Sequence, residues 1–172
     1  MYLFDRIVFF SQEPKQYMFS PTKAHVVQEY ISNVFLLEHL KFDFRVYVLL
    51  ASLDPLEVYI SKEGLARFCT VPYEEPTSRN INESFMHLTN YSLNKYSETY
   101  LHTEAEDDGS KRTITSVFKK LSSRGYDVER IWDDIKRMVI KTCLAMLGEL
   151  RVEHRAALPP HKAGPKCFQV CM

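Results

Sequence analysis

The sequence is short of glycine, of paired cysteine, of net charge and of long apolar runs. Five glycines occur in 172 residues and no two form a G-x-G pair, which excludes a Walker loop, a Rossmann fingerprint and a kinase-type glycine flap. None of the four cysteines has a C-x-x-C partner. Neither a zinc knuckle nor a disulfide framework is therefore indicated, and reduced thiols are expected.

Charge and hydropathy exclude two classes of partner. The 22 Lys and Arg residues balance 22 Asp and Glu residues, so we expect no polybasic arm for nucleic acid or for a membrane surface. No stretch approaches the ~18 consecutive apolar residues of a membrane span, and the apolar segment Met1–Phe10 has no cleavage-site pattern. We expect neither a nucleic-acid nor a membrane partner.

The first half of the chain has the pattern of strands separated by turns. Runs rich in β-branched and aromatic residues predict strands at His25–Ile31, Phe42–Ala51, Leu56–Ile60 and Gly64–Thr70. Pro55 favours a turn before the third of these strands. The segments that follow predict a polar loop at Pro72–Asn82, a short apolar–polar segment at Met86–Ser92 and an acidic loop at Thr103–Arg112.

The second half has helical periodicity. Apolar residues at positions 114, 117, 118 and 121 predict a helix that Gly125 is placed to end. Asp127 is placed to cap a longer helix, whose apolar stripe runs from Val128 to Met146 and which we expect to be core scaffold. A strand-like run follows at Cys167–Val170. The pattern predicts an α+β fold, with mixed or antiparallel strands first and helices after them.

The segment Lys41–Leu50 combines charge with strand periodicity. Because side chains alternate faces along a strand, its even positions would all be apolar and face the core. Lys41, Asp43 and Arg45 would lie in a row on the other face, ~6–7 Å apart. Such a row is typical either of a solvated strand with weak ion pairs or of a pocket floor, and the apolar residues that follow on the same face favour the pocket.

Two further segments carry polar groups that need partners. Arg67 lies between apolar neighbours on one face of a predicted strand, where its charge requires either a structural carboxylate or an anionic substrate. The segment His87–Ser92 has five hydrogen-bonding side chains in six residues. It is typical of a turn with local backbone bonds, and a binding loop is the alternative.

Eight short motifs follow one another along the chain: Val27-Gln28-Glu29-Tyr30-Ile31, Lys41-Phe42-Asp43-Phe44-Arg45-Val46-Tyr47, Asp54-Pro55-Leu56, Gly64-Leu65-Ala66-Arg67-Phe68, Met86-His87-Leu88-Thr89-Asn90-Tyr91-Ser92, Gly109-Ser110-Lys111-Arg112, Ile140-Lys141-Thr142 and Cys167-Phe168-Gln169-Val170. In this order they resemble the tubulin–tyrosine-ligase-like family, and in detail its polyglutamylase branch. The resemblance covers about residues 26–170.

The resemblance implies an ATP-grasp-like fold, in which ATP lies between two α+β subdomains without a P-loop. It also implies an ATP-dependent ligase: a carboxylate is phosphorylated, and the amine of free glutamate attacks the acyl phosphate to extend glutamate side chains or chains of tubulin. The implied cofactors are ATP and Mg²⁺, and the implied partners are free glutamate and the C-terminal tails of tubulin or microtubules. The implied location is the cytoplasm and cytoskeleton, with the cilium and basal body as candidates.

The same motifs imply roles for individual residues. The nucleotide site would comprise a strand of Gln28, Glu29, Tyr30 and Ile31 together with Lys41, Asp43, Thr89 and Asn90. Arg67 would bind a carboxylate of the incoming glutamate, with Arg45 beside it as a second catalytic residue. The amino-acid pocket would be completed by His87, Tyr91, Ser92 and Lys111. Several cations suit an anionic nucleotide and an acyl phosphate.

The chain departs from the family pattern in three places. Residues 1–24 match none of its motifs, so we expect a divergent segment there and a partial ATP-grasp domain in residues 25–172. The Asp and Glu-x-Asn residues that hold Mg²⁺ would follow the last strand and are absent, which predicts no metal ligand and little or no activity for this chain alone. Val34 and the Glu38-His39 pair replace a proline and an Asp-Gly-like turn.

Two other functions stay open on the sequence. One is a non-catalytic scaffold that binds tubulin or a nucleotide, and the other is a generic α+β interaction domain. Preference for α- or β-tubulin, and initiation or elongation of glutamate chains, have no sequence signal.

Overall fold

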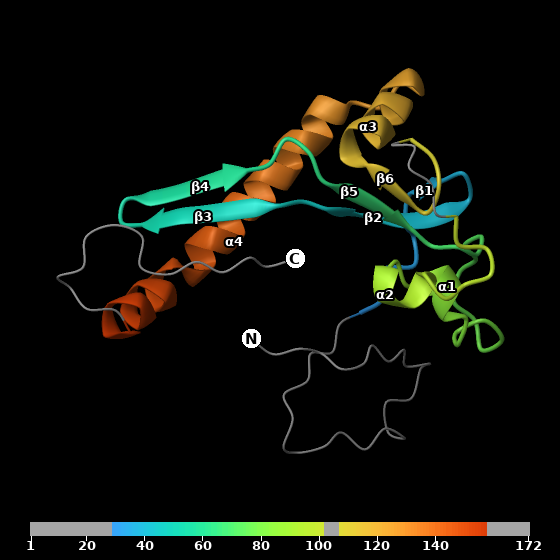
Figure 1. Cartoon of the computed structure of the whole chain (residues 1–172), viewed down its shortest axis with the longest axis horizontal. Helices are drawn as coiled ribbons and strands as arrows, with labels where there is room; N and C mark the ends of the chain where they lie inside the picture. Colours follow the sequence, from blue (N-terminus) through green and yellow to red (C-terminus); the bar gives the residue numbers. More distant parts are fainter. Residues whose placement is uncertain (1–28, 102–106, 158–172) are drawn as a thin grey trace, which may run out of the picture. The chain divides into compact units, whose positions relative to one another are not determined.

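The computed structural model describes residues 29–101 and 107–157 (Figure 1). These residues belong to two compact units: unit 1 contains residues 29–43 and 67–101, and unit 2 contains residues 44–66 and 107–157. The strands β2 (Leu40–Arg45) and β5 (Leu65–Phe68) carry the chain from one unit to the other. Each unit is described by itself below.

The strands form two sheets. One has the order β1-β2-β5-β6, with β1 at Leu36–Leu37 and β6 at Lys111–Thr113. The other is a hairpin of β3 (Val48–Leu53) and β4 (Leu56–Ile60). The pairs β1–β2 and β3–β4 are antiparallel. Together with the four helices of residues 29–101 and 107–157, mostly after the strands, this confirms the predicted α+β class.

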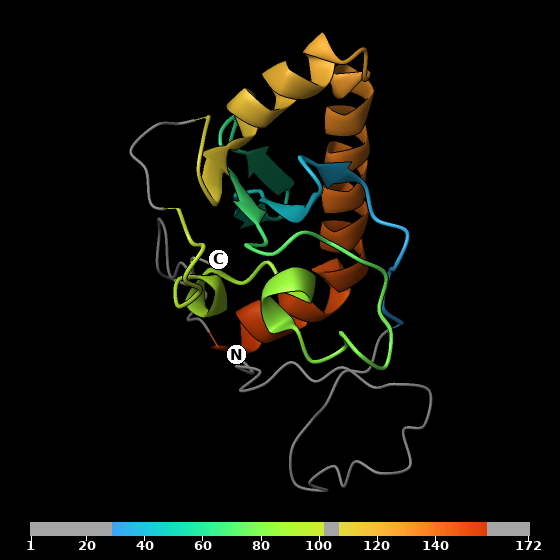
Figure 2. The ribbon, with the colours of Figure 1, turned by 90° about the vertical axis from the view of Figure 1, so that its right-hand side faces the viewer.

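Unit 1 has a small apolar core and two short helices. Leu37 and Phe68 are buried, and the ring of Phe42 stacks on that of Phe68 with centroids 5.1 Å apart. The helices α1 (Ser84–His87) and α2 (Tyr91–Asn94) overlap the two ends of the apolar–polar segment predicted at Met86–Ser92, and both are green coils in Figure 2.

The turn between β1 and β2 has unusual residues for its geometry. Leu37 pairs with Leu40, so only Glu38 and His39 form the loop, and their φ angles are 58° and 63°. A two-residue hairpin loop with positive φ at both positions is a type I′ turn, for which Asn-Gly and Asp-Gly are preferred. The structure therefore confirms a tight turn where the sequence replaces Asp-Gly by Glu-His, two residues that adopt this conformation at a cost.

In unit 2 the β3–β4 hairpin lies along the helix α4 (Val128–Ala157), as Figure 1 shows. The tip of the hairpin is tied to the end of this helix: Arg151 Nε donates to the Leu53 carbonyl at 2.9 Å, and the guanidinium groups of Arg151 and Arg155 lie 3.6 and 3.7 Å from the Asp54 carboxylate. Leu56–Ile60 was predicted as a strand with these bounds after a turn at Pro55, and both predictions are confirmed.

The helix α3 (Ile114–Ser123) begins against the segment before β5. Glu63 Oε1 accepts hydrogen bonds from the backbone N–H groups of Ile114 and Thr115 at 3.0 and 3.3 Å, which satisfies two donors that a helix start leaves without partners. Gly64 is packed so closely that a Cβ atom there would collide with the Arg45 carbonyl oxygen and would lie 2.7 Å from Ile114 Cδ1. Glycine at this position is therefore a steric requirement.

The predicted helix boundaries of unit 2 are confirmed. Gly125 follows α3 with a φ of 84°, the left-handed conformation that commonly ends a helix. Asp127 Oδ1 accepts a hydrogen bond from the backbone N–H of Arg130 at 2.9 Å, as expected of an N-cap. Figure 2 shows α3 and α4 joined through this turn.

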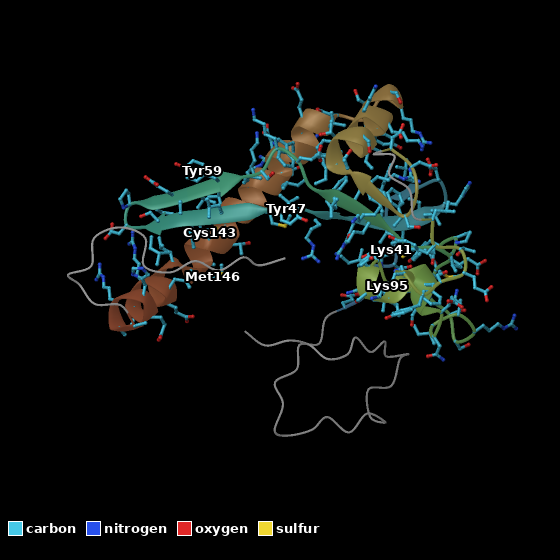
Figure 3. All side chains as sticks on the ribbon, in the orientation of Figure 1. Lys41, Tyr47, Tyr59, Lys95, Cys143 and Met146 are labelled. Atoms are coloured by element: carbon cyan, nitrogen blue, oxygen red, sulfur yellow. The ribbon has the colours of Figure 1, made fainter. Side chains whose placement is uncertain are left out.

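The prediction that α4 is core scaffold is confirmed in part: along the predicted stripe Cys143 is buried, and the half-buried residues are Val128, Ile131, Trp132, Ile135 and Val139. Among its described residues only Cys143 is buried, whereas Met138 and Met146 of the predicted stripe are 61% and 45% exposed. Figure 3 labels Cys143 and Met146 on this helix. The stripe has the periodicity of a buried face, but unit 2 covers only a part of it.

Three other predictions of secondary structure are corrected. The predicted strand Phe42–Ala51 is two strands interrupted at Val46 and Tyr47, because β3 leaves the first sheet to pair with β4. Residues 29–31 are in no strand, and Gln28 lies outside the described residues. Lys111 and Arg112 belong to β6, at the edge of the sheet, and not to a loop.

Other predictions lie outside the described residues, namely the strand-like run at Cys167–Val170 and those made for residues 1–28. None of the helices within 29–101 and 107–157 combines the length and the apolar content needed to cross a membrane.

Candidate functional site

Arg67 and Asp43 of unit 1 form an ion pair between neighbouring strands. Arg67 Nε donates to Asp43 Oδ1 at 2.8 Å, and Arg67 Nη2 donates to Asp43 Oδ2. The guanidinium therefore binds both carboxylate oxygens. The two side chains are 18% and 37% exposed. The structure thus gives Arg67 the carboxylate that its position among apolar neighbours requires, and bidentate pairing fixes the plane of the guanidinium.

Lys41 is held by two acceptors on the same side of β2. Its Nζ donates to the hydroxyl oxygen of Tyr30 and to the backbone carbonyl of His87, both at 2.9 Å, and lies 4.2 Å from the centroid of the Tyr30 ring. Figure 3 labels Lys41 on the part of β2 that faces the short helices. Burial lowers the pKa of Lys41, while the nearby Cys69 and Asp43 act in the opposite direction. The third ammonium N–H finds no hydrogen-bond acceptor within the described part of the chain.

His87 is almost completely enclosed, with 1% of its surface exposed. Its Nε2 lies 3.0 Å from the carbonyl oxygen of Asn80, its Nδ1 lies 3.3 Å from the Tyr30 hydroxyl, and the edges of the Tyr30 and Tyr73 rings meet it in T-shaped contacts. Burial lowers its pKa, as does the Lys41 charge. The ring has no open face, and contact of His87 with the amino-acid substrate stays a prediction.

Burial also affects the other titratable groups around Lys41. It raises the pKa of the Cys69 thiol to about 12, although the Lys41 charge acts against this change. Burial and a hydrogen bond with Tyr73 raise the pKa of Tyr30 above its ordinary value. Cys69 and Tyr30 are therefore neutral at physiological pH, and Lys41 and Asp43 are the charged groups here.

Asn94 fixes the loop that carries Thr89 and Asn90. Its side-chain amide donates to the carbonyls of Leu88 and Asn90 at 2.7 and 3.1 Å, and its Oδ1 accepts from Thr70 Oγ1 at 3.1 Å. Asn94 is 1% exposed, so this small network is buried and rigid. Thr89 and Asn90 themselves are half-buried between the two short helices.

The structure gathers only some of the predicted site residues. Tyr30, Lys41, Asp43 and Arg67 lie together in unit 1, and His87 is behind them. Tyr91 and Ser92 are exposed on α2, and Glu29 and Ile31 are exposed beside Tyr30. Arg45 and Lys111 belong to unit 2, where Arg45 is half-buried at the end of β2 and Lys111 is exposed.

Sequence reasoning missed three residues that build this region. Tyr73, Asn80 and Asn94 supply a ring, a backbone carbonyl and a buried amide. Tyr73 and Asn80 come from the segment predicted as a polar loop, and no periodic pattern marks them. Asn94 follows Asn90 by one helical turn, a spacing that suggests a side chain folded back onto the loop.

The chemistry of the gathered residues suits an anionic ligand. A lysine with a donor to spare and an arginine whose plane is fixed by a carboxylate can both bind phosphate or carboxylate oxygens. No group of three or more His, Cys, Asp or Glu side chains is arranged to hold a metal ion among residues 29–101 and 107–157. The gathered side chains therefore suit an anionic group such as a phosphate or a carboxylate.

Comparison with known proteins gives a consistent result. The sequence model of the Tubulin-tyrosine ligase family matches residues 4–171. The chain is 52% identical over 149 residues to "Tubulin polyglutamylase TTLL11" of Homo sapiens, which is 87% of this chain and 21% of that protein. It is 46% identical over 152 residues to ttll-11 of Caenorhabditis elegans (86% and 21%) and 41% identical over 150 residues to ttll6 of Danio rerio (87% and 19%), both also named tubulin polyglutamylases.

The chain spans about a fifth of the length of these relatives. The family match nevertheless covers almost every residue of the chain, including most of the segment before residue 25. This chain belongs to the tubulin–tyrosine ligase family.

Proposed function

We propose that this chain is part of an ATP-dependent ligase that adds glutamate to glutamate side chains or glutamate chains of tubulin. The observation that carries the proposal is its 52% identity, over 87% of its length, to a protein named a tubulin polyglutamylase. The proposed fold is the ATP-grasp arrangement of the family, which agrees with an α+β chain that lacks a glycine-rich phosphate loop.

Lys41 is the proposed nucleotide contact of unit 1. Its ammonium is held by Tyr30 and His87 so that one N–H stays available for a phosphate or adenine acceptor. Thr89 and Asn90 are proposed to line the same site from a loop that Asn94 holds in place. Gln28, Glu29 and Ile31 complete it in the proposal. ATP, when bound, supplies the phosphoryl group that turns the acceptor carboxylate into an acyl phosphate.

Arg67 is the proposed contact for the α- or side-chain carboxylate of the incoming glutamate, with Tyr91 and Ser92 of unit 1 as further proposed contacts. Arg45 and Lys111, which belong to unit 2, are also proposed to act on glutamate. The pair with Asp43 gives this role a physical basis. Asp43 orients the guanidinium before the substrate arrives, so less conformational entropy is lost on binding. In this arrangement Asp43 acts on glutamate through Arg67, in addition to its proposed role as an acceptor for the nucleotide.

The proposed partners are free glutamate and the acidic C-terminal tails of tubulin, and the proposed location is the cytoplasmic cytoskeleton, including cilia and basal bodies. The proposed cofactors are ATP and Mg²⁺. No step is assigned to the metal, since the described residues contain no ligand set for it.

The test is incorporation of labelled glutamate into microtubules. This chain is assayed alone and as a replacement for the matching 149 residues of human TTLL11. We expect the chimaera to incorporate glutamate with ATP, to lose incorporation when Arg67→Ala is introduced, and to retain ATP binding. A chimaera that binds ATP but adds no glutamate to microtubules would favour a non-catalytic scaffold.

Arg137→Ala is the matched control, because Arg137 also pairs with a neighbouring carboxylate but lies 64% exposed on α4. Normal incorporation by the Arg67→Ala chimaera would contradict the assignment of Arg67 to the amino-acid site.

A further inference from the structure

His87 is a buried titratable group for which contact with substrate provides no explanation. It is 1% exposed, and three different groups surround its ring: the Asn80 carbonyl, the Tyr30 hydroxyl and the Tyr73 ring. Its backbone carbonyl accepts a hydrogen bond from Lys41 at 2.9 Å. Two groups thus hold the Lys41 ammonium: the Tyr30 hydroxyl, which the His87 ring contacts, and the backbone carbonyl of His87 itself.

The hydrogen bonds place one proton on the ring, at Nε2. A carbonyl oxygen can only accept, so Nε2, at 3.0 Å from Asn80 O, must carry a proton. If the ring is neutral, Nδ1 is then an acceptor that faces the Tyr30 hydroxyl at 3.3 Å. If the ring were charged, Nδ1–H would point at the same Tyr30 oxygen to which Lys41 already donates.

The charges around His87 favour the neutral ring. Among the described residues, the charged groups that act on it are Lys41 and Glu83, and the other titratable groups in contact with it are Tyr30 and Tyr73. The hydrogen bond to the Asn80 carbonyl acts to raise the pKa of His87, and burial acts more strongly to lower it. Lys41 opposes a second positive charge and Glu83 supports one, while burial disfavours the charged form. The net effect is a pKa below the ordinary value for histidine.

We propose that His87 is a positioning residue for Lys41: held as the neutral Nε2–H tautomer by the Asn80 carbonyl, it leaves the Tyr30 oxygen and its own carbonyl to fix the Lys41 ammonium. Protonation of His87 places a competing donor at the Tyr30 oxygen and a like charge near Lys41, and so releases the ammonium. This inference rests on the proposed nucleotide role of Lys41 for its functional consequence, but its structural part does not.

The first test is the tautomer of His87 in the unmodified 172-residue chain, read from imidazole ¹⁵N chemical shifts across a pH titration. We expect the Nε2–H form at pH 7 and a pKa below 6.5. An Nδ1–H tautomer, or a ring that is charged at pH 7, would overturn the proposal. This measurement needs neither ATP nor a substitution.

The second test compares two substitutions that each keep one half of the imidazole. In His87→Asn the amide oxygen can take the place of Nδ1 and accept near Tyr30, whereas in His87→Gln the amide nitrogen can take the place of Nε2 and donate to Asn80. The readout is the pKa of Lys41, followed by ¹³C-methylation of lysines and assigned with Lys41→Arg. We expect that pKa to rise toward its ordinary value in His87→Gln and to stay low in His87→Asn.

ATP affinity is measured with the same variants. We expect His87→Gln to weaken binding by about tenfold, since the Lys41 acceptors are no longer held in place. We expect His87→Asn to rescue most of that loss and to remove the pH dependence that comes from protonation of the imidazole. His154→Gln, an exposed histidine of α4, is the control. A residue with only a structural role would change the stability of both variants and leave the Lys41 pKa and the order of ATP affinities unaltered.

Lys41→Met separates the two proposals. If Lys41→Met binds ATP normally, the proposed nucleotide contact fails. The positioning role of His87 is then still decided by the His87 tautomer and by the Lys41 pKa, both measured in chains that retain Lys41. If Lys41→Met weakens ATP binding but His87→Gln does not, the positioning role fails and the nucleotide contact stands.

Discussion

Unit 1 and the helix α4 of unit 2 both carry ion pairs, but the pairs differ in burial. Arg67 and Asp43 lie on adjacent strands, contact each other through two pairs of atoms and are 18% and 37% exposed. On α4, Lys136 pairs with Asp133 at 2.8 Å and Arg137 with Asp134 at 2.5 Å, with every side chain 46–64% exposed.

Residue type and the N–O distance of an ion pair therefore do not reveal which charged residues are candidates for function. An exposed pair competes with water at a high dielectric constant, and it loses side-chain entropy when it forms. A half-buried pair has already given up much of its hydration, so the removal of one partner leaves a charge without compensation. The charges of unit 1 are therefore candidates for function, and those of α4 are typical of a solvated helix face.

The largest expected effect is that of Asp43→Ala. Because Arg67 would be left partly buried without its carboxylate, we expect the free energy of unfolding to fall by about 1–3 kcal/mol. Asp134→Ala is the matched control, since it also removes the carboxylate of an arginine pair, and we expect a much smaller change. Urea unfolding of both variants is the measurement, and equal losses would contradict the comparison.

An intermediate effect is expected at Glu63, which is exposed yet accepts three backbone hydrogen bonds, from Gly64, Ile114 and Thr115. Burial acts to raise its pKa, but the hydrogen bond of the Thr115 side chain and the three backbone bonds outweigh it, so the pKa lies below the ordinary 4.5. Its stabilisation is then present above that pH and is lost as pH falls through the lowered pKa.

We expect Glu63→Ala to lower the free energy of unfolding by about 1 kcal/mol at pH 7, as for the loss of a helix cap. The difference from the unmodified chain is expected to shrink below pH 4, and unfolding curves at pH 7 and pH 3 check this. A difference that stays constant across this range would show that the charge of Glu63 has no part in capping α3.

The smallest effect is expected at Lys136. Lys136→Met removes the ion pair with Asp133 on an exposed face, and we expect the urea midpoint to stay within the scatter of replicate measurements. Any residual loss is expected to disappear at 1 M salt, where the Debye length is only ~3 Å. A clear loss of stability that persists at 1 M salt would contradict the distinction between the half-buried pair of unit 1 and the exposed pairs of α4.

The local elements could be predicted because their signals are local. The strand Leu56–Ile60, the start of α4 after Asp127 and the end of α3 at Gly125 follow from patterns and caps within a few residues. The interruption at Val46 and Tyr47 could not be predicted in this way. It depends on β3 turning to pair with β4, and alternation along the chain is the same whether a strand continues or changes partners.

The candidate site could be predicted in its residue types and less well in its geometry. Lys41, Asp43 and Arg67 were singled out, and they do lie together. The sequence alone does not decide whether Arg67 pairs with a structural carboxylate or with a substrate, because the pair with Asp43 joins two strands 24 residues apart in sequence. The burial of His87 depends on Tyr73 and Asn80, which reach it from a loop whose course no periodic signal records.

Gly64 allows two segments that are far apart in sequence to approach each other closely. A single added carbon at that position would meet the Arg45 carbonyl on one side and the Ile114 side chain on the other. In a library of all substitutions, position 64 should therefore tolerate nothing larger than hydrogen. Trimming Ile114 to valine or alanine should not rescue Gly64→Ala, because it removes the side-chain contact and leaves the closer one with the Arg45 backbone carbonyl.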